Sequence, residues 1–327
     1  MSSVAVSPPR MQLRHLACAV MLCAAMAPAG AQDWPARPVR IVAPFAPGGT
    51  TDTLARIVAE KLTGRLGQNF VVENRPGAGG LIGSEFVARA APDGYTFVVS
   101  GVAPHVIAPA MSNAPPFDPL KDFTHVALFG GPPTVLVVHP TLEARDLKEF
   151  VALSKARPGG ISFGSPGQGT QGHLTAEMFK ALSGANMTHV PYKGAALAMN
   201  DLIGGHIPAA SNTLTTAATQ IKAGKARALA LSAAKRLPDF ADVPTFAESG
   251  YPELVATVWF ALSGPAGLPA PIVGKLNAEV RAILRLPDVR ERLRPDGIEP
   301  NDLDAAAFTA FVRAEITRWT PIAKGVK

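Results

Sequence analysis

Residues 39–62 join a short apolar run, a loop of small residues and an amphipathic helix, and this succession constrains the fold more than any other feature. The segment reads VRIVAPFAPGGTTDTLARIVAEKL. The apolar run stops at Pro44, and residues 50–52 are all types that favour the N-cap of a helix. Apolar residues then recur at the spacing of one helix face, at Leu54, Ile57, Val58 and Leu62. A helix that opens directly off a buried strand is typical of α/β folds, and its free backbone N–H groups favour an anion.

Runs with the character of buried strands alternate with amphipathic segments along the rest of the chain. We expect strands at 39–43, 70–73, 96–100, 134–138, 161–163 and 228–232. We expect helices that include 54–62, 147–156, 174–182 and 195–203. This alternation predicts an α/β fold with largely parallel sheets, and the length of 327 residues favours two domains.

Two more strand ends open into loops of small residues. The segment 161–179, ISFGSPGQGTQGHLTAEMF, passes from a strand through a Gly/Ser loop into a helix, and the segment 98–106 ends a strand at Ser100-Gly101. Because open α/β sheets bind ligands at the carboxyl ends of their strands, we expect a binding cleft there. Glycine loops that only make tight turns are the alternative. His105 and His173 each follow such a loop and are candidate hydrogen-bond donors to a ligand.

The N-terminus predicts export. Arg10 and Arg14 precede an apolar stretch at 16–28, and residues 29–31 (AGA) form a signal-peptidase site, with cleavage expected after Ala31. Met11 is an alternative start. Both cysteines lie inside this signal, so we expect no disulfide and no thiolate site in the mature chain. Removing the two arginines from 31 Lys and Arg leaves 29 basic against 25 acidic residues, a mature net charge near +4. This excess is mild and scattered, and nucleic acid is not an expected partner.

Enzyme signatures are incomplete in this chain. Residues 167–172 match G-x-G-x-x-G after a strand, but residues 189–193, about 20 positions on, carry no carboxylate to hold a ribose. A nucleophile elbow would need glycine where Phe163 stands, and no H-E-x-x-H occurs. His173 and Glu177 lie four apart on one expected helix, so a metal site is the alternative to an ordinary first-turn histidine. We expect no catalytic residue, no metal and no cofactor.

Six phrases, in order over the mature chain, resemble the substrate-binding receptors of tripartite tricarboxylate transporters, called Bug receptors in Bordetella-type bacteria. They lie at 39–56, 71–101, 164–179, 189–207, 242–252 and 259–280, and include VVENRPGAGGLIGSEFVARAAPDGYTFVVSG and HVPYKGAALAMNDLIGGHI. The resemblance implies a two-domain periplasmic binding protein of type II-like fold, each domain a mostly parallel sheet flanked by helices, with the ligand cleft between domains. It implies a signal peptide at 1–31, a first domain formed by 32–130 plus 256–327, and a second domain at 131–255.

The same resemblance implies ligand contacts in three loops. In the first loop these are Phe45, Ala46, Pro47, Gly48, Gly49 and Thr50, with Asp52. In the facing loop they are Ser165, Gly167, Gln168, Gly169 and Thr170, with His173 close behind. The third lies near Ser211-Asn212, where Asn212 is the expected contact. Ser100 and Gly101, from the strand-end pattern above, complete the set. Family members that bind acidic amino acids often carry Asp in the third loop, whereas this chain has Ser211-Asn212-Thr213, which favours a carboxylate without an amine.

The function that these features imply is that of a periplasmic solute receptor that catalyses nothing. A small carboxylate would lie among backbone N–H groups and hydroxyls from both domains and would favour the closed state. The membrane subunits of a tripartite tricarboxylate-type transporter are the expected partners of a monomeric receptor. Arg75 is expected to hold its own loop, with a clamp on the carboxylate as the alternative. Trp259 and Phe260 are expected to pack in the core, with a place in a pocket wall as the alternative. Two alternatives stay open: an exported metal-dependent hydrolase on the same scaffold, and a ligand-sensing subunit for a signalling kinase.

Overall fold

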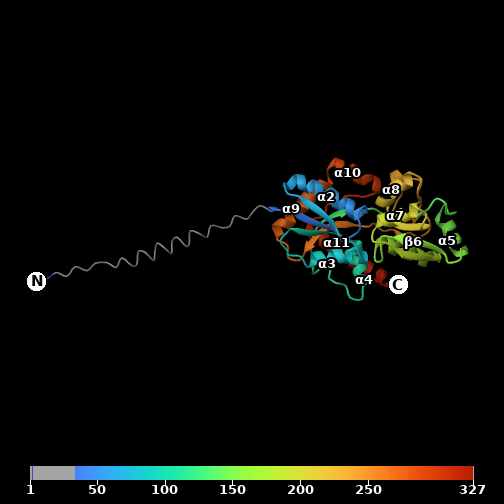
Figure 1. Ribbon diagram of the computed structural model, residues 1–327, viewed down its shortest axis with the longest axis horizontal. Helices are drawn as coiled ribbons and strands as arrows, with labels where there is room; N and C mark the ends of the chain where they lie inside the picture. The colour runs from blue at the N-terminus through green and yellow to red at the C-terminus, as the bar shows by residue number, and fades with distance from the viewer. Residues whose placement is uncertain (1, 3–33, 327) are drawn as a thin grey trace. The chain divides into compact units, whose positions relative to one another are not determined.

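The computed structural model describes Ser2 and residues 34–326 (Figure 1). The predicted signal peptide, with its cleavage site after Ala31, lies outside the described residues. Residues from Arg37 onward form one compact unit, which contains two five-stranded sheets. None of the described helices is both long enough and apolar enough to cross a membrane.

The first sheet takes strands from both ends of this unit, in the order β2-β1-β3-β10-β4. β1 pairs in parallel with β2 and β3, whereas β10 pairs antiparallel with β3 and β4. The carboxyl ends of β1, β2, β3 and β4 therefore lie at one edge of the sheet. The bounds are Val39–Ala43 for β1, Phe70–Asn74 for β2, Thr96–Gly101 for β3, Phe123–Gly130 for β4 and Phe260–Pro265 for β10.

The second sheet repeats this arrangement in the order β7-β6-β8-β5-β9. β6 pairs in parallel with β7 and β8, whereas β5 pairs antiparallel with β8 and β9. The predicted α/β class with two domains is confirmed, but both sheets are mixed. In each sheet the antiparallel strand is the one that the chain reaches by crossing from the other sheet, β10 in the first sheet and β5 in the second. The bounds are Thr134–Val138 for β5, Ile161–Ser165 for β6, Met187–Pro191 for β7, Ala209–Thr213 for β8 and Arg227–Leu231 for β9.

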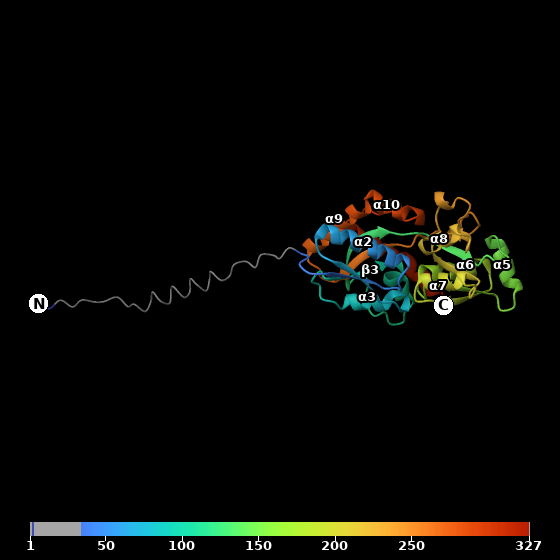
Figure 2. The same ribbon diagram turned by 45° about the horizontal axis from the view of Figure 1, so that its top comes forward.

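Helices flank each sheet, and most of them follow directly on a strand. Around the first sheet lie α2 (Thr50–Leu66), α3 (Leu81–Ala88), the π-helical turn η2 (Ala103–Ile107), α4 (Ala108–Met111), α9 (Ala270–Leu284), α10 (Pro287–Leu293) and α11 (Ala305–Gly325). Around the second lie α5 (Leu147–Ala156), α6 (Gln171–Ser183), α7 (Ala195–Ile203) and α8 (Leu214–Lys222). Figures 1 and 2 both show α2, α3 and α9 gathered at one end of the unit and α5, α7 and α8 at the other.

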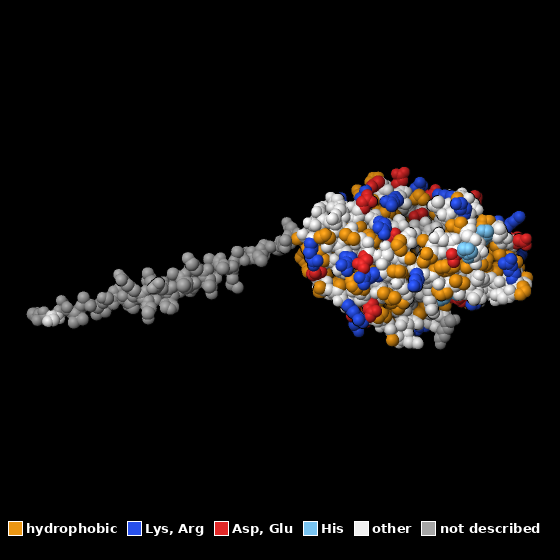
Figure 3. All heavy atoms as spheres, viewed as in Figure 1, with side chains coloured by type: hydrophobic (Ala, Val, Ile, Leu, Met, Phe, Trp, Pro, Cys, Tyr) orange, Lys and Arg blue, Asp and Glu red, His pale blue; other side chains and the backbone are white. Residues whose placement is uncertain are grey.

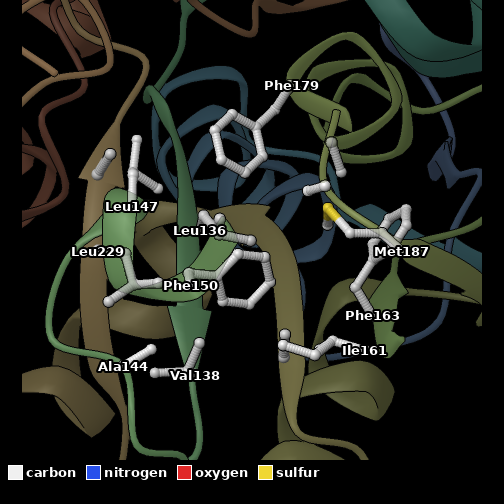
Figure 4. Packing of buried hydrophobic residues seen from close by; sticks show 14 of the residues in the cluster. Leu136, Val138, Ala144, Leu147, Phe150, Ile161, Phe163, Phe179, Met187 and Leu229 are labelled. Atoms are coloured by element: carbon white, nitrogen blue, oxygen red, sulfur yellow. The ribbon is translucent and has the colours of Figure 1, made fainter. Parts of the chain in front are cut away.

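β5 is buried on both faces and divides the core of the second lobe in two. Leu136 and Val138 pack with Phe150 of α5 and Phe179 of α6 (Figure 4). The intervening residues Val135 and Val137 face the other way, toward the apolar residues of α7 and α8. An uninterrupted apolar run in a strand is the sequence mark of such two-sided burial.

Two segments connect the sheets, 131–133 between β4 and β5 and 232–259 between β9 and β10, and they pair with each other. Pro133 and Thr257 form an isolated antiparallel bridge, and the Val258 N–H donates to the Pro132 carbonyl at 3.1 Å. A Cβ at Gly131 would lie 1.9 Å from the Val258 carbonyl oxygen, so this close approach requires glycine. The crossing is therefore a tight, paired connection.

Charges of both signs are interspersed on the face that Figure 3 shows. Several residues of opposite charge form ion pairs, such as Arg37 with Asp93 and Lys61 with Asp288. This distribution agrees with the scattered charge expected from the sequence.

Candidate functional site

The loop between β1 and α2 presents a free helix N-terminus. The N-cap residue is Gly49, which has no side chain with which to cap the helix. The first N–H groups of a helix have no carbonyl partner within the helix, so those of Thr50 and Thr51 remain available to an acceptor. Both residues are buried at the junction of the two lobes. The Thr50 hydroxyl reaches across to the Thr213 hydroxyl at 2.8 Å.

Asp52 braces this loop from behind. Its carboxylate accepts from the Gly48 N–H at 3.1 Å, from Asn74 Nδ2 at 3.0 Å and from Arg56 Nε at 3.0 Å. Burial alone would raise the pKa of Asp52, but these hydrogen bonds outweigh it and hold the pKa below its usual value. The carboxylate is ionised and fully engaged within the first lobe, so it shapes the loop that leads to the helix.

The loop between β6 and α6 is held by its own side chains. The Thr170 hydroxyl accepts from the His173 N–H at 3.3 Å and donates to the Gly167 carbonyl at 2.7 Å. Ser165 Oγ accepts from the Gly167 N–H at 3.1 Å and shares a 2.7 Å hydrogen bond with His189 Nε2. These bonds fix the loop in the conformation that exposes the start of α6.

His173 and His189 form a neutral pair behind this loop. Their ring centroids lie 4.2 Å apart, and His173 Nδ1 accepts from the Gly169 N–H at 3.4 Å. Burial lowers the pKa of His173, and burial together with the neighbouring charges of His173 and Lys180 lowers the pKa of His189 to about 3. Both rings are therefore uncharged near neutral pH. Glu177 pairs with Lys180 at 3.2 Å, and residues 34–326 hold no group of three or more His, Cys, Asp or Glu side chains that could bind a metal ion.

The helices α7 and α8 also begin at the junction of the two lobes. The N-cap of α7 is Gly194 and that of α8 is Thr213, whose hydroxyl bonds to Thr50. Across the cleft, the Ala46 N–H donates to the Lys193 carbonyl at 3.1 Å. A Cβ at Gly194 would lie 3.0 Å from the Ala46 Cβ. The two lobes are thus in direct contact on this side, in a closed arrangement.

A pocket lies between the lobes where these four helices begin. Its cavity volume of about 50 Å³ is enough to hold a few water molecules. The N-terminal residues of α2, α6, α7 and α8 all contribute to its wall. Among the described residues, none of those that line the pocket is charged. The lining residues are Phe45, Gly49, Thr50, Thr51, Ala103, Pro166, Thr170, Gln171, Gly172, Ala195, Thr213, Val258 and Phe260.

This geometry suits a carboxylate. Each helix N-terminus carries roughly half a positive charge, and the low-dielectric surroundings strengthen its effect on an anion. The N–H groups of Thr50 and Thr51 are available as donors, whereas the Leu214 N–H at the start of α8 already donates to the Pro133 carbonyl at 3.0 Å. Thr50, Thr51 and Thr213 also bring hydroxyl groups to the wall, whereas the Thr170 hydroxyl already donates to the Gly167 carbonyl. Phe45, Val258 and Phe260 provide apolar walls. The pocket can therefore hold a carboxylate without an arginine or a lysine.

The predicted site residues fall into three groups in the structure. Those in the pocket wall are Phe45, Gly49, Thr50 and Thr170. A neighbouring hollow is lined by Gly167 and Gln168, with Phe45 at its edge. The others support these loops or lie beside them: Ala46, Pro47, Gly48, Asp52, Ser165, Gly169, His173 and Asn212 around the pocket, and Ser100 and Gly101 in β3.

Ser100 and Gly101 serve the pairing of β3 with β10. Ser100 Oγ lies 2.7 Å from Ser263 Oγ, and a Cβ at Gly101 would lie 2.8 Å from the Trp259 carbonyl oxygen. Ser263 Oγ in turn lies 2.9 Å from His125 Nδ1. His105 is fully buried near this network, and neither of its ring nitrogens has a hydrogen-bond partner among the described residues.

Several lining residues were not among the predicted contacts: Thr51, Ala103, Pro166, Gln171, Gly172, Ala195, Thr213, Val258 and Phe260. Phe260 was expected in the core, with a place in a pocket wall as the alternative; it is buried and also lines the pocket. Its neighbour Trp259 does pack in the core, against Phe308, and donates to Glu315 at 2.9 Å. Arg75 holds its loop as expected, since it donates to Glu73 at 2.6 Å and stacks 3.6 Å from the Phe86 ring centroid. Gln171 and Thr213 both lie at helix starts, but an N-cap signal in the sequence does not tell which side chains of a helix start line a pocket.

Comparisons with known proteins agree with this fold and pocket. Residues 54–327 match the model of the tripartite tricarboxylate transporter family receptor. BugT of Bordetella pertussis is 38% identical over 299 residues, which cover 91% of this chain and 92% of BugT. The structure of R. palustris Rpa4515 with adipate is 37% identical, with a TM-score of 0.86 over 89% of this chain and 98% of that one. MatC of Rhodopseudomonas palustris, solved with bound malate, is 34% identical, with a TM-score of 0.84 over 89% of this chain and all of MatC (100%).

The family match begins at Leu54, after the loop between β1 and α2, and covers the whole second sheet and the loop between β6 and α6. The two-lobed fold is that of periplasmic binding proteins, and membership of such a family implies a periplasmic location. The chain belongs to the tripartite tricarboxylate transporter receptor family, a family of substrate-binding receptors.

Proposed function

We propose that this protein is a solute receptor that binds one small carboxylate in the pocket between its lobes and delivers it to the membrane subunits of a tripartite tricarboxylate-type transporter. It carries out no chemistry on the solute. It is exported through a signal peptide cleaved after Ala31 and acts as a monomer, with domains formed by 32–130 plus 256–327 and by 131–255.

One observation carries this proposal: four helix N-termini from two lobes converge on one pocket with no charged wall residue among the described ones. Unpaired N–H groups at helix starts need acceptors, and a carboxylate supplies them together with the negative charge that the helix dipoles favour. The relatives solved with adipate and malate also support a carboxylate. Of these two ligands only malate carries a hydroxyl, so membership of the family does not determine whether the solute of this chain has one.

The two-lobed site also supports a receptor that reports occupancy by closing. Contacts such as Thr50 with Thr213 and Ala46 with Lys193 exist only when the lobes meet. A solute that bridges the helix ends of both lobes stabilises this closed form relative to an open one. A membrane transporter that recognises the closed form would therefore distinguish the loaded receptor from the empty one.

A thermal-shift screen of the mature protein, from residue 32 onward, tests the proposal. The protein is first unfolded and refolded to remove any bound solute. The panel contains mono-, di- and tricarboxylates, acidic amino acids and aromatic acids, each beside its amide. A solute at 100 times its Kd adds about 2.7 kcal/mol of stability, which raises Tm by several degrees. We expect a shift with at least one acid and none with its amide.

A matched pair of variants locates the effect. Thr213→Val removes a hydroxyl from the pocket wall, and we expect it to reduce the shift. Thr219→Val makes the same change on the exposed side of α8 and should leave the shift intact. Zinc and a chelator are included, because a response to metal with silence from every acid would overturn the proposal in favour of a metal-dependent enzyme.

A further inference from the structure

The side chain of Gln171 is an unused hydrogen-bonding group in the wall of the pocket. Gln171 is the first residue of α6 and is only 3% exposed. Its Oε1 is buried and has no hydrogen-bond partner in residues 34–326. Buried polar atoms are normally paired, because an unpaired one loses its bonds to water without replacement. Because Gln171 lines the pocket, its unpaired amide oxygen is a candidate acceptor for a group on whatever the pocket binds.

A second unpaired acceptor lies close by. Asn212, in β8, is 0% exposed, and its Nδ2 donates to the Ala195 carbonyl at 3.3 Å. Ala195 itself lines the pocket as the first residue of α7. The Asn212 Oδ1 has no partner within the described part of the chain. The helix ends thus supply donors for a carboxylate, whereas Gln171, which lines the pocket, leaves an acceptor that a donor group on the solute would satisfy.

The charge around the pocket determines which kind of hydrogen-bond donor on the solute can bind there. An ammonium group would face the positive ends of four helices, and no acidic side chain is found among the described lining residues. Asp52, the nearest carboxylate on α2, is already engaged by Gly48, Asn74 and Arg56. A neutral donor, such as a hydroxyl, avoids this repulsion and still satisfies the amide oxygen.

We propose that the solute is a carboxylate with a hydroxyl group close to the carboxyl, and that the Gln171 amide is the group that selects for this hydroxyl. This inference rests on the proposed function, since it assumes that a carboxylate occupies the pocket. The carboxylate lies at the helix starts, one of which is the start of α6, so a donor to the Gln171 side chain lies near the carboxylate in the solute. Phe45, Val258 and Phe260 contact its apolar part.

Titration calorimetry of the refolded mature protein with matched acids tests the inference. The pairs are succinate with malate, glutarate with 2-hydroxyglutarate, propionate with lactate, and 3-phenylpropanoate with 3-phenyllactate, beside aspartate, glutamate, alanine and phenylalanine as the 2-amino analogues. For the skeleton that binds, we expect the hydroxy acid to bind at least about tenfold more tightly than its deoxy partner, which corresponds to about 1.4 kcal/mol.

Variants separate the role of Gln171 from that of the fold. Gln171→Leu keeps the approximate size of the side chain and removes the amide, so the preference should fall to about twofold or less, mainly through weaker binding of the hydroxy acid. Gln220→Leu, the same change on α8 outside the pocket wall, should leave the preference unchanged. Gln171→Met is the second variant if the leucine variant fails to fold.

The outcomes distinguish this inference from the proposed function. Equal or tighter binding of the deoxy acid, tightest binding of the amino acid, or an unchanged preference in the folded Gln171 variants would overturn the inference, while the carboxylate receptor would stand. If no acid of any skeleton binds, the proposed function fails and the inference fails with it.

Discussion

Closure of the two lobes over the pocket can be tested at Gly194. This residue is the N-cap of α7, and its backbone is extended, with φ 163° and ψ 157°, so alanine can adopt the same conformation without strain. The added Cβ would lie 3.0 Å from the Ala46 Cβ and 3.3 Å from the Ala46 backbone nitrogen, both in the other lobe. The clash therefore exists only when the lobes are closed.

The expected loss of ligand affinity in Gly194→Ala follows from the short distances between the added Cβ and Ala46. Carbon atoms at their optimal separation lie about 3.5–4.0 Å apart, so the closed form must shift by several tenths of an ångström. Overpacking of this kind costs about 1–3 kcal/mol. Because ligand binding favours the closed form, the same free energy should appear as a roughly 5- to 150-fold increase in Kd.

Titration calorimetry with the best acid from the thermal-shift panel measures this change, and the Tm of the ligand-free protein serves as the check on folding. The control is Gly64→Ala, on α2, where an added Cβ meets no atom within 4 Å. It should leave Kd unchanged and, as an exposed helical glycine, raise stability by up to about 1 kcal/mol. An unchanged Kd for Gly194→Ala would refute the closure argument, and so would a large fall in its ligand-free Tm.

Two further predictions concern the first lobe and the crossing segments. Burial lowers the pKa of His125 to about 4 from 6.5, so the unfolded chain binds more protons between these values and stability is lost as pH falls through that window. His125 accounts for a loss of about 3 kcal/mol in the free energy of unfolding. Urea unfolding at pH 7 and pH 4 should therefore show a smaller loss of stability for His125→Gln than for the unmodified protein. An equal loss in both proteins would contradict this assignment. Gly131→Ala should cost about 3 kcal/mol or more in urea unfolding, because its Cβ would lie 1.9 Å from the Val258 carbonyl oxygen and both partners are backbone. Near-native stability of that variant would show that the crossing segments separate easily.

The elements predicted most accurately are those whose local pattern is self-sufficient. The run 134–138 and the helices 147–156 and 195–203 were predicted with the bounds that β5, α5 and α7 have in the structure. In β5 every residue is apolar except the first, and α5 begins after Asp146, whose side chain caps it. Local propensity, burial and capping all agree in these segments, so the sequence alone is enough.

The strands β4, β7, β8 and β10 are missing from the strands expected from the local pattern, and for β8 and β10 the physical reason is the same. β8 reads AASNT and β10 reads FALSGP, and neither shows the branched or alternating apolar residues that indicate a strand. Both are nevertheless fully buried, because each lies inside a sheet between two partners. Their strand conformation comes from tertiary pairing, which a local pattern does not contain.

The residues of the candidate site also differ in whether a local sequence pattern predicts them. The loop that leads to Thr50 and the cap at Thr170 carry N-cap signals, and both residues lie in the pocket wall. Gln171 follows Thr170 directly, but no local signal distinguishes a first-turn side chain that faces the pocket from one that faces solvent. Thr213 and Phe260 reach the pocket only because β8 and β10 take their places in the two sheets.

A crystal structure of the mature protein with the acid that gives the largest thermal shift would test the central claim most directly. Our account predicts that the carboxylate lies between the lobes, within hydrogen-bond distance of backbone N–H groups at the starts of α2 and α6, with the Gln171 amide beside a neutral donor on the solute. A solute bound elsewhere on the protein, or held in the pocket away from these helix starts, would contradict it.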